Sequence, residues 1–188
     1  MSAQLLRATD LIGRPVVTLG GESPFEIKDI VFDSSTGRLL GFNLRNHGFL
    51  GSPAEERLAL DDVHGLGPDA VVVADADCLD ASVDLATGSG GDVLGNRILT
   101  DDGTELGEVV EVIITSGRSA EVVGFEVAAA EGVRAGDHHV FIPMPDTSAI
   151  SGERIVVPDA AVEYIRDDLT GFGGAVAEFR ERLSGGTR

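Results

Sequence analysis

The sequence has few of the residues that cross-link small domains or give them large aromatic cores. Its 188 residues include one cysteine, Cys78, no tryptophan, one tyrosine and eight phenylalanines. A single cysteine excludes an intrachain disulfide and gives no sign of an oxidising compartment. Because only 5% of residues are aromatic while 43% are hydrophobic, the core is expected to be aliphatic. Such a Val- and Gly-rich composition favours strands and tight turns over a helical bundle.

Positive charge is also scarce. The chain has 14 Lys and Arg residues against 32 Asp and Glu, a formal charge of -18, and Lys28 is its one lysine. Because the sequence has no basic patch to offset this charge, binding to nucleic acid or to an anionic membrane surface is disfavoured. An arginine-rich, acidic composition is typical of a bacterial protein from a high-GC genome, or of adaptation to salt.

Long hydrophobic runs are absent. The first ten residues, MSAQLLRATD, lack the apolar core of a signal peptide. No run approaches the roughly 20 apolar residues that a spanning helix requires. The sequence therefore predicts a cytoplasmic protein with no integral membrane segment.

The sequence does contain a long internal repeat. The segment DLIGRPVVTLGGESPFEIKDIVF (10–32) recurs as DVLGNRILTDDGTELGEVVEVII (92–114). The match continues through Gly41-Phe42 against Gly124-Phe125, and through 57–73 against 141–157. Internal repetition of this kind determines the architecture before any single motif does. We expect repeat 1 over 8–79, a Gly- and Ser-rich linker over 80–91, repeat 2 over 92–158, and a helical segment over 159–184.

Short apolar runs separated by turn residues predict strands in each repeat. Because no crossover helices fit between them, we expect an antiparallel sheet, which at this size closes into a small barrel. The long strands are apolar on both faces, so the second face should pack against the other barrel or against another chain in a homodimer. In the tail we expect a helix over 160–169, an interruption at three glycines, and a second helix over 175–183. The expected strands are 15–19, 25–33, 39–45, 57–60 and 70–74, then 97–99, 106–115, 121–128, 139–143 and 154–157.

Both repeats resemble the PRC-barrel domain, the small barrel named for the cytoplasmic part of the photosynthetic reaction centre H subunit. The C-terminal domain of a ribosome maturation factor is similar. The resemblance rests on the opening D-[LV]-[IL]-G, the strand-turn-strand segments DIVFDSSTGRLLGFNL (29–44) and EVIITSGRSAEVVGFEV (111–127), and the closing segments 58–73 and 142–157. GFLG (48–51) resembles a loop that many members carry. The repeats depart from each other at Phe25 against Gly107 and at Ala59 against Pro143. The resemblance implies two tandem barrels that form a non-catalytic assembly module.

Few residues suggest chemistry. Asp29 and Glu111 place an acid at the same position of both apolar strands. They could form a charged-ligand or cation site, although carboxylates that accept hydrogen bonds from nearby amides or arginines are the commoner explanation. The doublet His138-His139 is a poor chelating pair, because adjacent strand residues point to opposite faces. Cys78 has no neighbour that would activate it. ATGSGGD (86–92) lacks the Gly-Lys-Ser/Thr ending of a phosphate-binding loop.

Two apolar groups are candidate protein-interaction residues. Phe49 and Leu50 lie in a Gly-rich excursion, where they either cover the barrel or meet a partner. Val176, Phe179 and Leu183 recur at helical spacing, which more often means docking on the chain's own barrel than insertion into a partner's groove. The sequence therefore predicts a non-enzymatic adaptor or scaffold that binds protein partners and needs no cofactor. The alternative is a regulatory protein that binds a small ligand or cation through Asp29 and Glu111.

Overall fold

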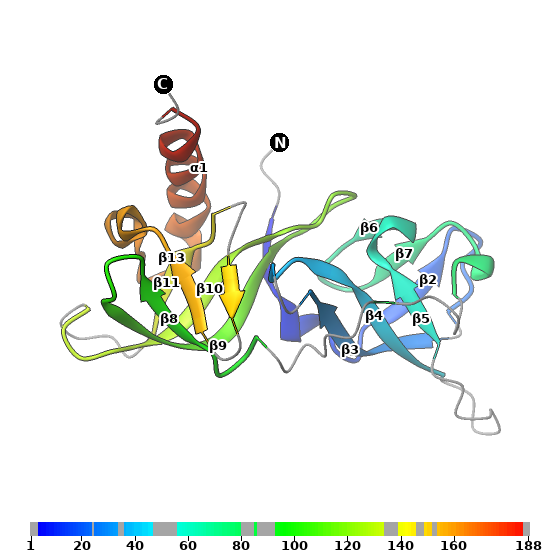
Figure 1. Ribbon diagram of the computed structural model, residues 1–188. Helices are drawn as coiled ribbons and strands as arrows, with labels where there is room; N and C mark the ends of the chain where they lie inside the picture. Colours follow the sequence, from blue (N-terminus) through cyan, green and yellow to red (C-terminus); the bar gives the residue numbers. More distant parts are fainter. Residues whose placement is uncertain are drawn as a thin grey trace. The chain divides into compact units, whose positions relative to one another are not determined.

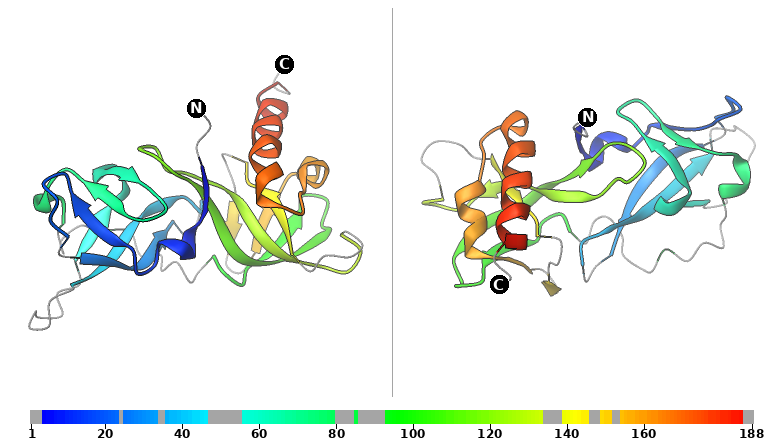
Figure 2. Two further views of the ribbon diagram at one scale, coloured as in Figure 1. Left: turned by 180° about the vertical axis from the view of Figure 1, so that it is seen from behind. Right: turned by 90° about the horizontal axis from the view of Figure 1, so that it is seen from above.

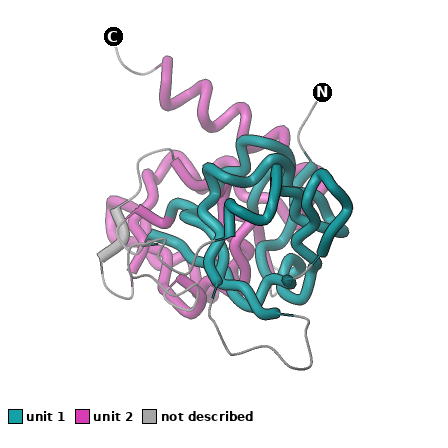
Figure 3. Tube along the Cα trace, turned by 90° about the vertical axis from the view of Figure 1, so that its right-hand side faces the viewer, with its two compact units in different colours: residues 1–33, 38–90, 114–121 teal, residues 34–37, 91–113, 122–188 magenta. Residues whose placement is uncertain are grey.

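Figure 1 shows the computed structural model, which describes residues 4–23, 25–33, 36–46, 56–79, 85, 93–133, 139–145, 149–151 and 154–185. The chain divides into two compact units, coloured separately in Figure 3. Unit 1 comprises residues 1–33, 38–90 and 114–121, and unit 2 comprises residues 34–37, 91–113 and 122–188. The units follow the two repeats except at the hairpin tips, since 114–121 comes from repeat 2 and 34–37 from repeat 1.

Unit 1 is built on a six-stranded sheet in the order β5-β4-β3-β2-β7-β6. The 3-10 helices η1 (Ala8–Leu11), η2 (Leu60–Asp62) and η3 (Ala76–Cys78) connect or follow these strands. The strand β1 (Leu5–Arg7) pairs with β9 of repeat 2. The sheet strands are β2 (Pro15–Thr18), β3 (Phe25–Phe32), β4 (Leu39–Asn46), β5 (Arg57–Ala59), β6 (Val63–Leu66) and β7 (Val71–Val73).

Unit 2 repeats this plan in the order β11-β10-β9-β8-β13-β12. Its sheet is followed by the 3-10 helix η5 (Asp159–Tyr164) and by α1 (Leu169–Gly185), which lie beside each other in both views of Figure 2. The strands are β8 (Arg97–Thr100), β9 (Glu105–Thr115), β10 (Val122–Ala129), β11 (His139–Pro143), β12 (Ala149–Ser151) and β13 (Arg154–Val157).

The sheets are mainly but not wholly antiparallel, so one expectation needs correction. The first strand of each repeat runs parallel to a strand near the end of that repeat, β2 with β7 and β8 with β13. Most strands that follow each other along the chain pair as antiparallel hairpins, but these two partners are separated by four strands and can meet in parallel. Within the described residues the sheets are not closed into barrels: their end strands are β5 and β6 in unit 1, and β11 and β12 in unit 2.

The core of each unit is mainly aliphatic, although Phe42 in unit 1 and Phe125, Phe172 and Phe179 in unit 2 are fully buried. In unit 1 the side chains of Ile27, Phe42 and Leu58 are fully buried on the inner face of the sheet. The opposite face of β3 is buried only in part, since Val31 is 3% exposed while Lys28 is exposed. The apolar second face of the long strands is therefore covered over a limited area.

The C-terminal segment differs from expectation. Residues 159–164 form η5 rather than an α-helix. The expected helix is then interrupted at Arg166, which forms an antiparallel bridge with Phe141 of β11. α1 then runs from Leu169 without interruption through the three glycines. Each glycine costs a helix interior roughly 1 kcal/mol, but the complete burial of Phe172 and Phe179 outweighs that cost.

Candidate functional site

The candidate site is the outer face of each sheet, which we define as the face that carries Asp29 in unit 1 and Glu111 in unit 2. Register places Asp29, Asn43 and Arg57 in one row across β3, β4 and β5. The aligned residues of repeat 2 are Glu111, Glu126 and Phe141, and Glu126 is the register partner of Phe141. The two units thus present the same geometry with different chemistry.

A glycine at the same place in both outer faces leaves room for an apolar side chain from elsewhere in the unit. A Cβ on Gly124 would lie 2.5 Å from Cζ of Phe172 in α1 and 2.4 Å from the carbonyl oxygen of Ile142. A Cβ on Gly41 would lie 3.1 Å from Cδ2 of Leu85. We call these positions the glycine seats. The sequence alignment matches the two glycines. Sequence periodicity did not predict the side chains that fill the seats, because Leu85 and Phe172 come after the aligned segments of the two repeats.

The two strand carboxylates are already engaged by backbone. Asp29 Oδ1 accepts a hydrogen bond of 2.8 Å from the amide of Ile30, and Glu111 Oε1 accepts one of 2.8 Å from the amide of Val112. Glu111 is 6% exposed, whereas Asp29 is half-buried. A hydrogen bond from the adjacent amide offsets part of the cost of burying a polar side chain. This geometry agrees with the structural explanation of the pair, that of carboxylates satisfied by neighbouring amides.

The helical stripe lies mainly inside unit 2. Val176 is 6% exposed and Phe179 is fully buried, while Leu183 is half-buried. The Phe179 ring lies 5.4 Å from that of Tyr164 in η5, and the Phe172 ring lies 5.6 Å from that of Phe141. These contacts dock α1 on its own unit, the commoner of the two expectations. Phe49 and Leu50 lie outside the described residues.

The remaining polar groups form local pairs. His139 Nδ1 lies 3.1 Å from Glu126 Oε1, and His64 Nε2 lies 3.1 Å from Arg118 Nη2. Cys78 is half-buried and its thiol lies 3.7 Å from a carboxylate oxygen of Asp75. Across the described ranges, no three His, Cys, Asp or Glu side chains are grouped so that they could hold a metal ion. In that same part of the chain, no helix is long and apolar enough to cross a membrane.

The turn between β8 and β9 of unit 2 has a distinct electrostatic character. Asp102, between β8 and β9, accepts hydrogen bonds from the Thr100 hydroxyl and, at 3.2 Å, from the Thr104 amide. These bonds lower the pKa of Asp102, the Thr100 hydroxyl having the larger effect. Asp101 Oδ1 accepts a hydrogen bond from the Asp159 amide at 2.9 Å. The carboxylates therefore fasten a turn and the start of η5.

A comparison with protein families finds the PRC-barrel domain twice, at residues 4–75 and 89–163. The chain belongs to the PRC-barrel family. The two PRC-barrel matches cover the two repeats. These are the repeats that share a sheet order, a glycine seat and a strand carboxylate. No curated protein matches the chain. The PRC-barrel assignment thus explains the shared framework, and the differences between the repeats have to be interpreted from their own residues.

Proposed function

We propose that this tandem PRC-barrel protein is a non-enzymatic, cytoplasmic adaptor or scaffold that binds protein partners through its sheet surfaces and variable loops. One observation carries the proposal: the repeats keep their buried framework and change their outer faces. Gly41 and Gly124 hold the same place in the two sheets. The row of Asp29, Asn43 and Arg57 in unit 1 nevertheless aligns with Glu111, Glu126 and Phe141 of repeat 2. Duplicated surfaces that diverge over a constant core suit two binding sites of different specificity.

The local chemistry supports binding more than catalysis. The carboxylates of Asp29 and Glu111 accept hydrogen bonds from their own strands, and His139 and His64 pair with Glu126 and Arg118. A catalytic site needs an acid, base or nucleophile directed at a space where a substrate can lie. Closure of each sheet into a full barrel is part of the proposal, because closure would protect the edge strands β5, β6, β11 and β12.

Affinity capture from native lysate tests the adaptor function. The tagged full-length chain should recover at least one protein in near-stoichiometric amount, after washes at moderate salt that remove weak contacts. A matched bait with Gly41→Val and Gly124→Val, which disturbs both glycine seats, should recover less of it. Recovery of no stoichiometric protein by the unaltered chain would refute the adaptor function.

A further inference from the structure

The outer face of unit 1 has the opposite charge balance to the rest of the molecule. Six aligned positions of the two outer faces can be compared: Glu26, Lys28, Asp29, Asn43, Arg45 and Arg57 in repeat 1 correspond to Glu108, Val110, Glu111, Glu126, Ala128 and Phe141 in repeat 2. Repeat 1 therefore has three bases and two acids, whereas repeat 2 has three acids and no base. The whole chain has 14 basic and 32 acidic side chains, so the bases on unit 1 run against its composition.

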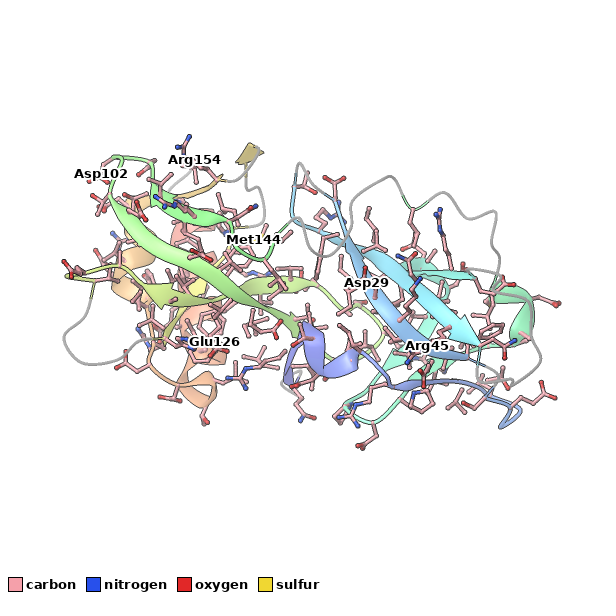
Figure 4. The ribbon with its side chains drawn as sticks, turned by 90° about the horizontal axis from the view of Figure 1, so that it is seen from below. Asp29, Arg45, Asp102, Glu126, Met144 and Arg154 are labelled. Carbon is pink, nitrogen blue, oxygen red and sulfur yellow. The ribbon has the colours of Figure 1, made fainter. Side chains whose placement is uncertain are left out.

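Strand register brings these unit 1 residues together. Arg45 is the cross-strand partner of Glu26, and Arg57 shares a row with Asn43 and Asp29. Figure 4 labels Arg45 and Asp29 on adjacent strands of the sheet. Lys28 lies at the irregularity in register between Ile27 and Asp29 and is exposed. The bases are far apart in sequence, which is why no basic patch is visible there.

The guanidinium of Arg45 is both accessible and oriented. Its side chain is 62% exposed, and Nε donates a hydrogen bond of 2.6 Å to Glu26 Oε1, with Nη2 bonded to the same oxygen. Arginine has five N–H donors in a rigid planar fork, so a guanidinium held on one side can still meet a carboxylate on another. The Glu26 contact positions Arg45 for such recognition.

In unit 2 the aligned outer face is covered by a helix of the same unit. Phe172, from a helix, fills the Gly124 seat and contacts Phe141, and the aligned row there is largely buried, with Glu111 at 6% and Phe141 at 4% exposure. In unit 1 the corresponding Asp29 and Arg57 are only half-buried. The Gly41 seat is filled by Leu85, which is itself buried at 8% exposure, whereas Ala59, the register partner of Gly41, is half-buried.

We propose that the outer face of unit 1 binds an acidic amphipathic helix of a partner protein. The apolar stripe of that helix would pack on Ala59 and on the aliphatic stems of Arg45 and Arg57. Its carboxylates would meet the charged ends of Arg45, Arg57 and Lys28. A second copy of this chain is a poor occupant, because on its own acidic face Glu111 is only 6% exposed and cannot reach the arginines of another copy. The inference rests on the proposed adaptor function and specifies its surface and the chemistry of its partner.

A pair of peptides tests the charge and the location of this site. The probe is a peptide of about 18 residues, long enough to be helical, with a leucine stripe and glutamates on its polar face. Its twin has lysine at every glutamate. Titrated into the isotope-labelled full chain, the glutamate peptide should shift the amide resonances of Asn43, Arg45 and Arg57. It should bind at least about tenfold more tightly than the lysine twin. Equal affinities, no binding, or shifts confined to unit 2 would overturn the proposal.

Variants assign the binding to the arginines. The double variant Arg45→Glu, Arg57→Glu should bind the glutamate peptide about tenfold or more weakly than the unaltered chain. The control variant Arg97→Glu, Arg154→Glu, on the sheet of unit 2, should change the affinity by less than about twofold. Because reversal at half-buried Arg57 could unfold the sheet, Arg45→Gln alone provides a second variant and should weaken binding by about threefold. Comparable losses in the control pair, or an unchanged affinity for Arg45→Gln, would refute the assignment.

Two further results distinguish this proposal from a general anion site and from an adaptor that uses another surface. A single-stranded oligonucleotide of similar length that competes equally with the glutamate peptide would make the face a general anion site, and the acidic-helix proposal would be wrong. A lysate partner that is retained in full by the Arg45→Glu, Arg57→Glu variant would leave the adaptor function in place but exclude this surface as its binding site.

Discussion

Substitution of a glycine in a glycine seat should affect stability differently from substitution of an exposed glycine. A Cβ on Gly124 would lie 2.4 Å from the Ile142 carbonyl oxygen and 2.5 Å from the Phe172 ring, distances at which backbone and a buried ring must both shift. We expect Gly124→Ala to lower the free energy of unfolding by about 2 kcal/mol or more.

A matched control exists in α1. A Cβ on exposed Gly174 meets no atom within 4 Å, so Gly174→Ala should raise the free energy of unfolding by about 0.5–1 kcal/mol through helix propensity. Urea denaturation of both variants measures the difference. Two substitutions of the same sign would contradict this account of the seat.

The β8–β9 turn predicts a component of the acid sensitivity. Hydrogen bonds from Thr100 and Thr104 lower the pKa of Asp102 in the folded chain below that in the unfolded chain. Stability from this carboxylate is therefore present above the unfolded pKa, about 3.9, and is lost as pH falls through the lower folded pKa.

Asp102→Asn should remove that component, so the variant should lose less stability than the natural chain between about pH 4 and pH 2. The measurement is the midpoint of urea unfolding as a function of pH. Asp77→Asn is a suitable control, because Asp77 is an exposed acid of unit 1. A pH profile for Asp102→Asn that is parallel to that of the natural chain would show that the turn bonds do not contribute.

At the scale of elements, α1 is fixed to unit 2 by two aromatic contacts. Phe172 joins the helix to the sheet through the Gly124 seat and Phe141, and Phe179 joins it to Tyr164 of η5. We expect Phe172→Ala or Phe179→Ala to cost about 3–5 kcal/mol, because both side chains are fully buried.

Leu183→Ala, near the end of the same stripe, should cost less than about 1.5 kcal/mol, because Leu183 is half-buried. Denaturation with circular dichroism detection compares the three variants. If Leu183→Ala were as damaging as Phe179→Ala, the stripe would be anchored along its whole length, contrary to the contacts described for α1.

The same elements show what sequence patterns can predict. The longer strands are extended apolar runs bounded by turn residues and were confirmed within one or two residues, for example 25–33 against β3 and 106–115 against β9. The short strands β1, β6 and β12 were missed, because three or four residues give too little periodicity. The helix over 175–183 was predicted, but its continuation through Gly171 and Gly174 was missed, because the stability there comes from tertiary burial of Phe172 and Phe179 rather than from local propensity.

For the candidate site, the alignment of Gly41 with Gly124 and of Asp29 with Glu111 could be predicted, because repeats preserve sequence spacing. The grouping of Arg45 and Arg57 could not. It depends on the register of β3, β4 and β5, which places residues from three separate segments in adjacent rows. Register is set by turn geometry and by the buried face, and an expected strand boundary does not specify it.

At the scale of the whole molecule, repeat 2 supplies part of unit 1. The β9–β10 hairpin tip, residues 114–121, belongs to that unit. The amide of Leu66 in β6 donates a hydrogen bond of 3.0 Å to the Gly117 carbonyl, and the Gly117 amide donates one of 2.9 Å to the Leu66 carbonyl. Because β6 ends the sheet of unit 1, this bridge protects part of an edge strand.

A fragment of residues 1–90 should therefore fold less stably than unit 1 does in the full chain, since it retains β6 but lacks the hairpin tip. Amide hydrogen exchange provides the measurement at residue level. Leu66 should exchange at least about tenfold faster in the fragment, because its N–H loses the Gly117 acceptor and the edge opens to water. The internal control is Val16, fully buried in β2, whose exchange should rise only in proportion to the global loss of stability. If Leu66 stayed as protected relative to Val16 as in the full chain, repeat 1 would be self-sufficient. The loss of protection expected instead means that repeat 2 has a structural role in the fold of repeat 1.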